Sequence, residues 1–400
     1  MPHMTEAFTP LAIAACTATS AMGTGIAATR AALHARRGGI SAAPPEDRPA
    51  PFTGRVPGVD GVALPEELAR FDCRNNRLAE LALRQDGFLA AIEQARARFG
   101  AARIAIVMGT STSGIAETEA AYRRRPEGQE ALPGDFDFAA THDLFSLPRY
   151  LRARLGLSGP ALTISTACTS GARAFLEAAT MIRAGLCDAA LVGGVDTLCR
   201  MTVEGFGSLA LLAPGPTRPC SADRDGITVG EAAGFALLTR VADAPPGTAR
   251  LLGAGASSDG HHMSSPHPDG LGAVSAMRAA LLAAGLAPED IDYINLHGTG
   301  TRANDAMEDR AVFHLFGATV PCSSTKGFTG HTLGASGALE VVIALICMED
   351  GLVPGCLGVE TVDPEFRADV ATANRALPVR RVLSNSFGFG GSNCSLVLGA

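Results

Sequence analysis

The sequence predicts an α/β protein with layered sheets, and two observations carry that prediction. Short apolar segments of strand length alternate along the chain with alanine- and leucine-rich segments of helix length. The apolar segments are nearly continuous rather than alternating, as expected for strands that helices cover on both faces. The chain has 400 residues and 47% hydrophobic side chains, so it can bury a large core in one α/β unit or in two domains.

The predicted strands follow one another in chain order, and most stop at a glycine or a polar residue. After a first buried strand at 11–16, strands are expected to end at Gly109, Cys168, Asp196, Val241, Gly298, Gly327 and Gly388. Between them, helices are expected at 170–184, 273–284, 305–316 and 333–350. The proline- and glycine-rich stretch 38–61 is expected to run over the surface.

The stretch 242–250, ADAPPGTAR, is the clearest internal linker. It divides the chain into an N-terminal half, residues 1–246, and a C-terminal half, residues 247–400. Each half contains strand ends followed by residues suited to chemistry. We therefore expect two similar halves, although no repeat is visible in the sequence.

Charge and cysteine content narrow the classes of function. The formal net charge of −7 argues against broad attraction to nucleic acid, so no nucleic-acid partner is expected. Ten cysteines without a CxxC pair are typical of a reducing compartment. The first residues lack the basic start of a signal peptide, and the longest apolar runs are too short to span a bilayer. We expect a cytoplasmic protein with no membrane span.

Cys168 stands where a predicted strand ends and a helix of small residues begins. A helix N-terminus presents free N–H groups and a partial positive charge, which bias a thiol toward the thiolate that attacks carbonyls. A cysteine taken alone is more often part of a core. Later segments hold His297, Lys326 with His331, and a glycine-rich loop at 385–393. This combination favours the nucleophile and predicts an acyl-transfer site.

Four ordered motifs resemble those of the β-ketoacyl–acyl carrier protein synthases of the thiolase-like superfamily. They are TACTSG at 166–171, HGTGT at 297–301, KGFTGHTLGASGALE at 326–340 and GFGGSN at 388–393. The resemblance spans nearly the whole chain and implies a five-layered αβαβα fold of two similar halves, usually in a dimer. It also implies an acyl carrier protein as partner, with substrates carried on its phosphopantetheine and no bound cofactor.

The resemblance implies a role for each residue of the predicted site. Cys168 would hold the acyl chain, and His297 and His331 would donate to the enolate left when a malonyl thioester loses CO2. The backbone N–H groups of Cys168 and Phe389 would form the oxyanion hole. Lys326 would be a buried cation that orients His331 and the groups around it.

Other residues are assigned to substrate binding. Thr299 and Thr301 would bind the amides of the phosphopantetheine arm, and Phe206 and Phe389 would contact the substrate. Thr112 aligns with a position near the acyl pocket where fatty-acid enzymes of the family often have a larger aliphatic side chain. The Phe389 loop and the histidine-rich loop around residue 259 would move together as a gate for the acyl chain.

For Glu340 two interpretations stay open. It lies on a solvated helix face, or it belongs to a buried polar network with Asn295 and Asn385 that could include a structural monovalent cation. The histidines at 261–267 match no zinc-ligand spacing, so no metal site is expected there.

Two segments depart from the fatty-acid enzymes of the family. IAACTATSAMG, at 13–23, lacks the usual glycine run led by Thr-Gly, and FDCRNNRLAELAL, at 71–83, is also unusual. Both are closer to ketosynthases of bacterial aryl-polyene pigment clusters. The primer, the chain length and the carrier are left open, as is the choice between a homodimer and a heterodimer with a ketosynthase-like paralogue.

Rival functions of other classes fit less well. A noncatalytic chain-length partner subunit shares the implied fold but lacks the nucleophile that Cys168 provides. A degradative thiolase would need a second cysteine near the C-terminal glycine loop, where this chain has NSFGFGG. A pure binding module would have no reason to collect a thiol, two histidines and a lysine.

Overall fold

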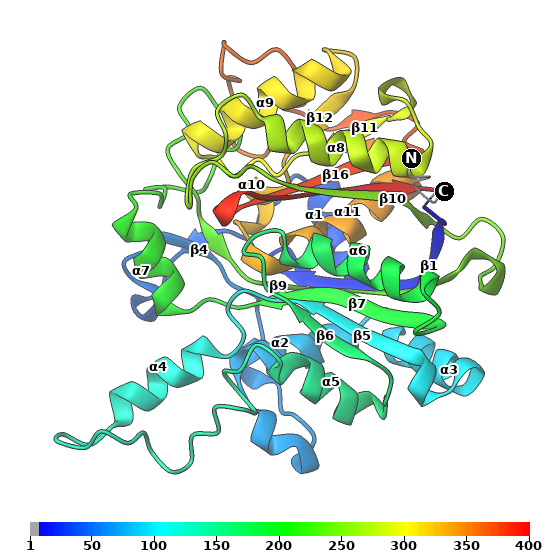
Figure 1. Cartoon of the computed structure of the whole chain (residues 1–400). Helices are drawn as coiled ribbons and strands as arrows, with labels where there is room; N and C mark the ends of the chain where they lie inside the picture. The colour runs from blue at the N-terminus through cyan, green and yellow to red at the C-terminus, as the bar shows by residue number, and fades with distance from the viewer. Residues whose placement is uncertain (1–7) are drawn as a thin grey trace.

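The computed structural model describes residues 8–400, and a mixed β-sheet built from both halves of the chain forms its centre (Figure 1). The order of this 12-stranded sheet is β14-β12-β11-β16-β17-β10-β1-β9-β7-β5-β6, with β2 paired to β1. The N-terminal half contributes β6-β5-β7-β9-β1, and the C-terminal half repeats that arrangement as β12-β11-β16-β17-β10. β1 joins β10 in an antiparallel pair with Leu11 opposite Leu251. The repeated order confirms the two similar halves.

The strands of the N-terminal half are β1 (Leu11–Ser20), β2 (Gly23–Thr24), β5 (Ile104–Gly109), β6 (Ala161–Ile164), β7 (Ala189–Asp196) and β9 (Ala232–Arg240). Those of the C-terminal half are β10 (Arg250–Ser258), β11 (Tyr293–Asn295), β12 (Pro321–Ser323), β14 (Asp369–Val370), β16 (Arg381–Gly388) and β17 (Ser392–Gly399). In each half the pairs on either side of β5 or β11 are parallel, and the pairs made by β9 or β17 are antiparallel. The halves therefore share pairing direction as well as order.

Helices lie between the half-sheets and on their outer faces, which confirms the five-layered fold (Figure 1). The inner layer holds α6 (Ser170–Arg183) and α11 (Ser336–Asp350), which contact strands of both halves, with α1 (Gly25–His34) beside them. The outer layers hold α2 (Arg74–Leu83), α3 (Phe88–Phe99) and α5 (Ser146–Leu155) on one side, and α8 (Leu271–Ala284) with α9 (Arg302–Phe316) on the other. Nearly all of α11 is buried, as expected for a helix enclosed by two sheets.

Several predicted boundaries shift where the site begins. β6 ends at Ile164 rather than at Cys168, because the residue before the cysteine, Ala167, has a positive φ of 53° that no strand allows. β12 ends at Ser323, and a short helix, α10 (Lys326–Thr329), replaces the expected strand end. The first strand is longer than expected and pairs with β9 as far as Ser20.

The stretch 38–61 is only partly a surface excursion. It contains β3 (Ser41–Ala42) and β4 (Phe52–Gly54), which form a small sheet with β8 (Val229–Gly230), and Val59 within it is fully buried. Smaller elements complete the chain: α4 (Ile115–Arg124), α7 (Arg200–Ser208), and the pair β13 (Leu352–Val353) and β15 (Arg375–Ala376). The linker at 242–250 separates β9 from β10, and the domain boundary placed there stays a prediction. Among residues 8–400, every helix is too short or too polar to cross a membrane.

Candidate active site

Cys168 lies in the turn between β6 and α6, two positions before the helix begins at Ser170. Ala167, just before it, adopts a left-handed backbone conformation with φ of 53°. Such a conformation costs a non-glycine residue free energy and is typical of functional turns. The side chain of Cys168 lines a cavity, yet the residue is only 7% exposed. The turn therefore presents a shielded thiol to an internal space.

Burial decides the protonation of this thiol. It raises the pKa of Cys168 from 9.0 to about 11. The charge of Lys326 and the backbone N–H groups of Phe389 and Cys168 lower the pKa, but by less than burial raises it. The expectation that the helix terminus favours the thiolate is thus wrong for the resting site, which holds a neutral thiol. The two N–H groups near the sulfur are those assigned to the oxyanion hole.

His331 faces the thiol, with its Nε2 atom 3.1 Å from Cys168 Sγ. Its Nδ1 atom accepts a hydrogen bond from the backbone N–H of Leu333 at 3.2 Å. A backbone N–H can only donate, so Nδ1 is unprotonated and the proton of the neutral ring lies on Nε2. Burial and the charge of Lys326 hold the pKa of His331 well below 6.5. The ring is therefore a neutral donor directed at the sulfur.

His297 reaches the same point from the loop after β11. Its ring centroid is 5.2 Å from that of His331, and the Nζ atom of Lys326 is 3.4 Å from its Nδ1 atom. An ammonium group can only donate, so this contact also leaves the ring proton on Nε2. Burial and the charge of Lys326 lower the pKa of His297 well below 6.5. Both histidines thus present an Nε2–H group.

The ligand-type atoms of Cys168, His297 and His331 all lie within 4.8 Å of one another. Three such atoms could hold a metal ion, and the absence of a metal stays a prediction. The same convergence places two neutral donors and one nucleophile close enough to act on one carbonyl group. That is the arrangement which acyl transfer needs.

Lys326 and Glu340 form a buried ion pair. Lys326 Nζ donates to Glu340 Oε1 at 2.6 Å, and the two residues are 1% and 2% exposed. The solvated-face interpretation of Glu340 is therefore wrong. Lys326 forms its hydrogen bond with His297 rather than with His331. The prediction that Lys326 orients His331 is therefore wrong. The backbone N–H of Leu333 and the hydroxyl of Ser336 contact the His331 ring instead.

The three residues of the predicted buried polar network, Glu340, Asn295 and Asn385, do not form one hydrogen-bonded group. Asn385 Nδ2 donates to Glu308 Oε1 at 3.2 Å, and its Oδ1 accepts from the hydroxyl of Ser395 at 2.8 Å. Its hydrogen bonds thus go to Glu308 and not to Glu340, because its side chain points to the α9 side of the sheet. Within residues 8–400, Glu340 Oε2 and both amide atoms of Asn295 are buried without a hydrogen-bond partner.

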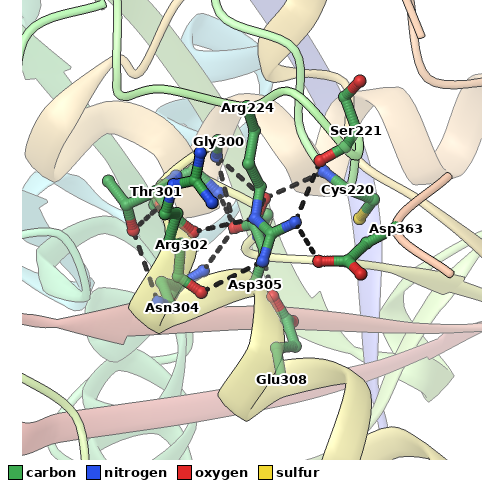
Figure 2. A network of polar contacts seen from close by, with 12 residues as sticks. Cys220, Ser221, Arg224, Gly300, Thr301, Arg302, Asn304, Asp305, Glu308 and Asp363 are labelled. Carbon is green, nitrogen blue, oxygen red and sulfur yellow. Dashed lines mark hydrogen bonds and ion pairs between the residues drawn. The ribbon is translucent and has the colours of Figure 1, made fainter. Parts of the chain in front are cut away.

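Two carboxylates of α9, Asp305 and Glu308, hold the loop that contains His297. Figure 2 shows Asp305 bound to Gly300 of this loop. Glu308 accepts from the backbone N–H groups of His297 at 2.8 Å and Gly298 at 2.7 Å. Asp305 accepts from the N–H of Thr299 at 2.9 Å and, across the fold, from that of Cys220 at 2.9 Å. Because both acids accept from several backbone N–H groups of this loop, they set its position.

A cavity of about 450 Å³ opens onto Cys168 and both histidines. Four residues assigned to substrate also line it: Thr299, Thr301, Phe206 and Phe389. The rings of Phe206 and Phe389 are 5.7 Å apart. Thr112 is not part of this lining; it is 1% exposed and its hydroxyl donates to Asp196 at 2.9 Å. The cavity therefore gathers the nucleophile, both histidines and the predicted substrate residues except Thr112, while Lys326 lies behind the histidines and outside the lining.

Sequence reasoning missed three contributors. Asp196 binds the loop that contains Thr112, and the only sequence signal was an acid at the end of a buried apolar strand. Leu333 fixes the ring proton of His331 through a backbone group, which side-chain patterns cannot reveal. Arg302 lines the cavity beside the threonines and is exposed. Its position directly after HGTGT was the available signal.

Comparisons with known proteins agree with this geometry. The family model described as "Beta-ketoacyl synthase, N-terminal domain" matches residues 9–244, and the one described as "Beta-ketoacyl synthase, C-terminal domain" matches residues 248–360. The mitochondrial 3-oxoacyl-[acyl-carrier-protein] synthase of Arabidopsis thaliana is 38% identical over 267 residues, which are 62% of this chain and 58% of that protein.

Two further relatives extend over most of the chain. 3-oxoacyl-[acyl-carrier-protein] synthase 2 of Rhizobium meliloti (strain 1021) is 32% identical over 382 residues, 88% of this chain and 89% of the relative. A chain of the solved structure of the ketosynthase ApeO in complex with its chain length factor ApeC, from Xenorhabdus doucetiae, has a TM-score of 0.89 and 39% identity, with 98% of both chains covered. With the Cys168–His297–His331 cluster in place, the chain belongs to the β-ketoacyl synthase family and is a ketosynthase.

Proposed function

We propose that this ketosynthase condenses an acyl group held on Cys168 with malonyl–acyl carrier protein and releases CO2. The observation that carries the proposal is the protonation of His331, whose Nε2–H faces Cys168 Sγ at 3.1 Å while Leu333 occupies Nδ1. A histidine fixed in this form donates a hydrogen bond and does not accept a proton at Nε2. This favours the stabilisation of an enolate over general-base activation of the thiol.

In the first step, Cys168 Sγ attacks the thioester carbonyl of the acyl carrier. A bond forms from Sγ to the carbonyl carbon, the bond from that carbon to the carrier sulfur breaks, and the thiol proton leaves with the carrier thiol. The backbone N–H groups of Cys168 and Phe389 stabilise the intermediate oxyanion. The charge of Lys326, which lowers the pKa of the thiol against burial, stabilises the sulfur as it loses its proton.

In the second step, the malonyl group loses CO2 by cleavage of its C–C bond, which leaves an enolate. The Nε2–H groups of His297 and His331 donate to the enolate oxygen, an effect worth roughly 10²–10⁴-fold in rate. The enolate carbon then attacks the acyl carbonyl on Cys168. The new C–C bond forms, the bond to Sγ breaks, and the released sulfur takes up one proton from solvent.

An acyl carrier protein is the proposed partner, with its phosphopantetheine arm in the cavity. Thr299 and Thr301, which line the cavity with hydroxyls 3.0 Å apart, support binding of the amides of the arm. Arg302 adds a positive charge to the same lining, and among residues 8–400 it forms no ion pair. A free arginine there suits a phosphate or an acidic carrier.

We propose a heterodimer with a ketosynthase-like paralogue, since the likeness to the ApeO–ApeC structure covers 98% of both chains. A homodimer is the alternative. The segments 13–23 and 71–83 support an aryl-polyene product rather than a fatty acid. The ten cysteines are all free thiols in the structure, which supports a cytoplasmic location.

A monovalent cation is proposed near Glu340. The partnerless buried oxygens of Glu340, Asn295 and Ser386 are hard donors of the kind that such ions bind. Asn295 and Ser386 lie on the neighbouring strands β11 and β16, and α11, which carries Glu340, packs on β16. A bound ion would supply a fixed positive charge beside the carboxylate. Replacing potassium by choline should then lower the midpoint of thermal unfolding, and Glu340→Gln should remove that difference.

The test of the condensation uses the purified chain with its paralogue, an acylated carrier and malonyl carrier. Intact-mass spectrometry should find an acyl adduct on Cys168, then a β-ketoacyl carrier and released CO2. A noncatalytic chain-length subunit would give neither adduct nor product, and that result would overturn the proposal. Cys168→Ala is the matched negative control.

A further inference from the structure

Asp196, the last residue of β7, is a buried carboxylate whose bonds all go to neighbouring loops. It is 0% exposed, and within residues 8–400 no lysine, arginine or histidine forms an ion pair with it. Its Oδ1 atom accepts from the hydroxyl of Thr110 at 2.6 Å and from the backbone N–H of Thr112 at 2.9 Å. A buried charge without a counterion is costly, so these bonds must offset a large desolvation penalty.

The other oxygen of Asp196 binds the turn that follows His331. Its Oδ2 atom accepts from the backbone N–H of Gly334 at 2.6 Å, across 138 residues of sequence. The hydroxyl and the N–H of Ser111 bind the same oxygen. One carboxylate thus joins the loop at 110–112 to the turn at 333–335.

That turn is closely packed on two sides. A Cβ atom on Gly334 would lie 2.7 Å from Asp196 Oδ2 and 3.0 Å from Ser111 N. On its other side, a Cβ atom on Gly171, in the first turn of α6, would lie 2.7 Å from the carbonyl oxygen of Gly334. The turn is therefore wedged between the start of the nucleophile helix and the carboxylate.

The same turn decides which ring nitrogen of His331 carries the proton. Leu333, directly before Gly334, donates its N–H to His331 Nδ1 at 3.2 Å. Leu333 has φ of 54°, a left-handed conformation that is costly for this residue type and that surrounding contacts must maintain. The hydrogen bond of the next residue to Asp196 is such a contact.

We propose that Asp196 is a positioning residue for His331: it holds the 333–334 turn so that the ring keeps its Nε2–H directed at the reacting group beside Cys168. The proposal rests on the condensation proposed above, because it says that Asp196 keeps the Nε2–H of His331 in position to donate to the enolate. It predicts that the loss of decarboxylation passes through His331. The charge of Asp196 also raises the pKa of Cys168, so its removal lowers that pKa and gives no reason for acyl loading to slow.

The test variant is Asp196→Asn. The amide keeps the volume of the side chain but offers one acceptor oxygen where two are used, so it cannot hold both the loop and the turn. We expect release of CO2 from malonyl carrier to fall by roughly 10- to 100-fold, the size of effect that a small misplacement of a catalytic group produces. Transfer of an acyl group to Cys168 should fall less than about threefold, because that step does not use the Nε2–H of His331.

A double-variant cycle separates positioning from general damage. In the His331→Ala background, Asp196→Asn should lower CO2 release no further, since the ring it acts through is gone. Ser111→Ala is the matched control: it removes one donor to the same carboxylate and leaves the Gly334 bond in place. It should keep the wild-type ratio of the two half-reactions.

Gly334→Ala repeats the test from the other side if Asp196→Asn does not fold. The added methyl group would push the turn away from the carboxylate, and the same selective loss of CO2 release is expected. Equal losses in both half-reactions, or additive losses in the His331→Ala background, would overturn the proposal. A wild-type enzyme that releases no CO2 from malonyl carrier would instead refute the condensation itself.

Discussion

The backbone N–H of Leu333 donates to His331 Nδ1 at 3.2 Å, and this bond decides which nitrogen of the ring carries the proton that faces Cys168. Lys326 has the same effect on His297 through a contact of 3.4 Å. Two unrelated donors thus impose one protonation state on both rings. Because both imidazoles are neutral and buried, they can donate to developing negative charge without taking up a proton, as the proposed condensation requires.

Cys168 should be the acylated residue, and its reactivity should report its burial. Because burial raises its pKa to about 11, the resting thiol is neutral at pH 7, and its alkylation rate should rise about tenfold per pH unit up to about pH 10. Peptide mapping after treatment with a cerulenin-like electrophile should find this cysteine labelled. Cys220 and Cys322 are more deeply buried than Cys168 and do not line the cavity, so their labelling, with activity retained in Cys168→Ala, would contradict the assignment.

His297 and His331 should serve decarboxylation more than acyl loading. In His297→Ala and His331→Ala, release of labelled CO2 from malonyl carrier should fall by roughly 10²–10⁴-fold, since each variant removes one enolate donor. Acyl transfer to Cys168 should survive much better. If either variant loses both half-reactions equally, that histidine acts as a base for the thiol.

Glu308 should make stability depend on pH. Burial raises its pKa from 4.5 to about 7, although the N–H groups of Gly298 and His297 oppose the shift. Between these values the unfolded chain has lost the proton that the folded chain keeps, so the free energy of unfolding should fall as the pH rises from about 4.5 to about 7. Chemical denaturation across this window should show a shallower slope for Glu308→Gln. Glu127→Gln, at an exposed position, should leave the slope unchanged.

Phe389 should act as a gate for the acyl chain. Its loop is tied to the histidine-rich loop by hydrogen bonds from Asp259 N to Gly391 O and from Gly390 N to Met263 O, each 2.8 Å. Phe389 itself is only partly buried, between glycines that allow backbone rotation. Phe389→Ala should slow single-turnover acylation of Cys168 and lower stability by less than the ~3–5 kcal/mol of a core truncation. A large stability loss with normal loading kinetics would instead identify the ring as a core residue.

Local sequence patterns were enough to predict where the catalytic side chains stand along the chain. Cys168 follows a strand and precedes a small-residue helix, and Lys326 and His331 share one glycine-rich segment; both patterns are local and survive without tertiary information. Near-continuous apolar strands also sufficed for the layered α/β class, because a strand covered on both faces needs apolar side chains at every position.

The protonation states and hydrogen-bond partners of those residues depend instead on the folded surroundings. The thiol of Cys168 is neutral because the fold buries it, and burial outweighs the helix terminus that the local pattern suggested. The Thr112 hydroxyl donates a hydrogen bond to Asp196, 84 residues away. The Asn385 amide donates one to Glu308, 77 residues away. Hydrogen-bond partners so far apart in sequence come together only because β7 and α9 pack against loops from other parts of the chain. Desolvation and long-range hydrogen bonds depend on the whole surroundings of a group, and no local pattern of residues contains them.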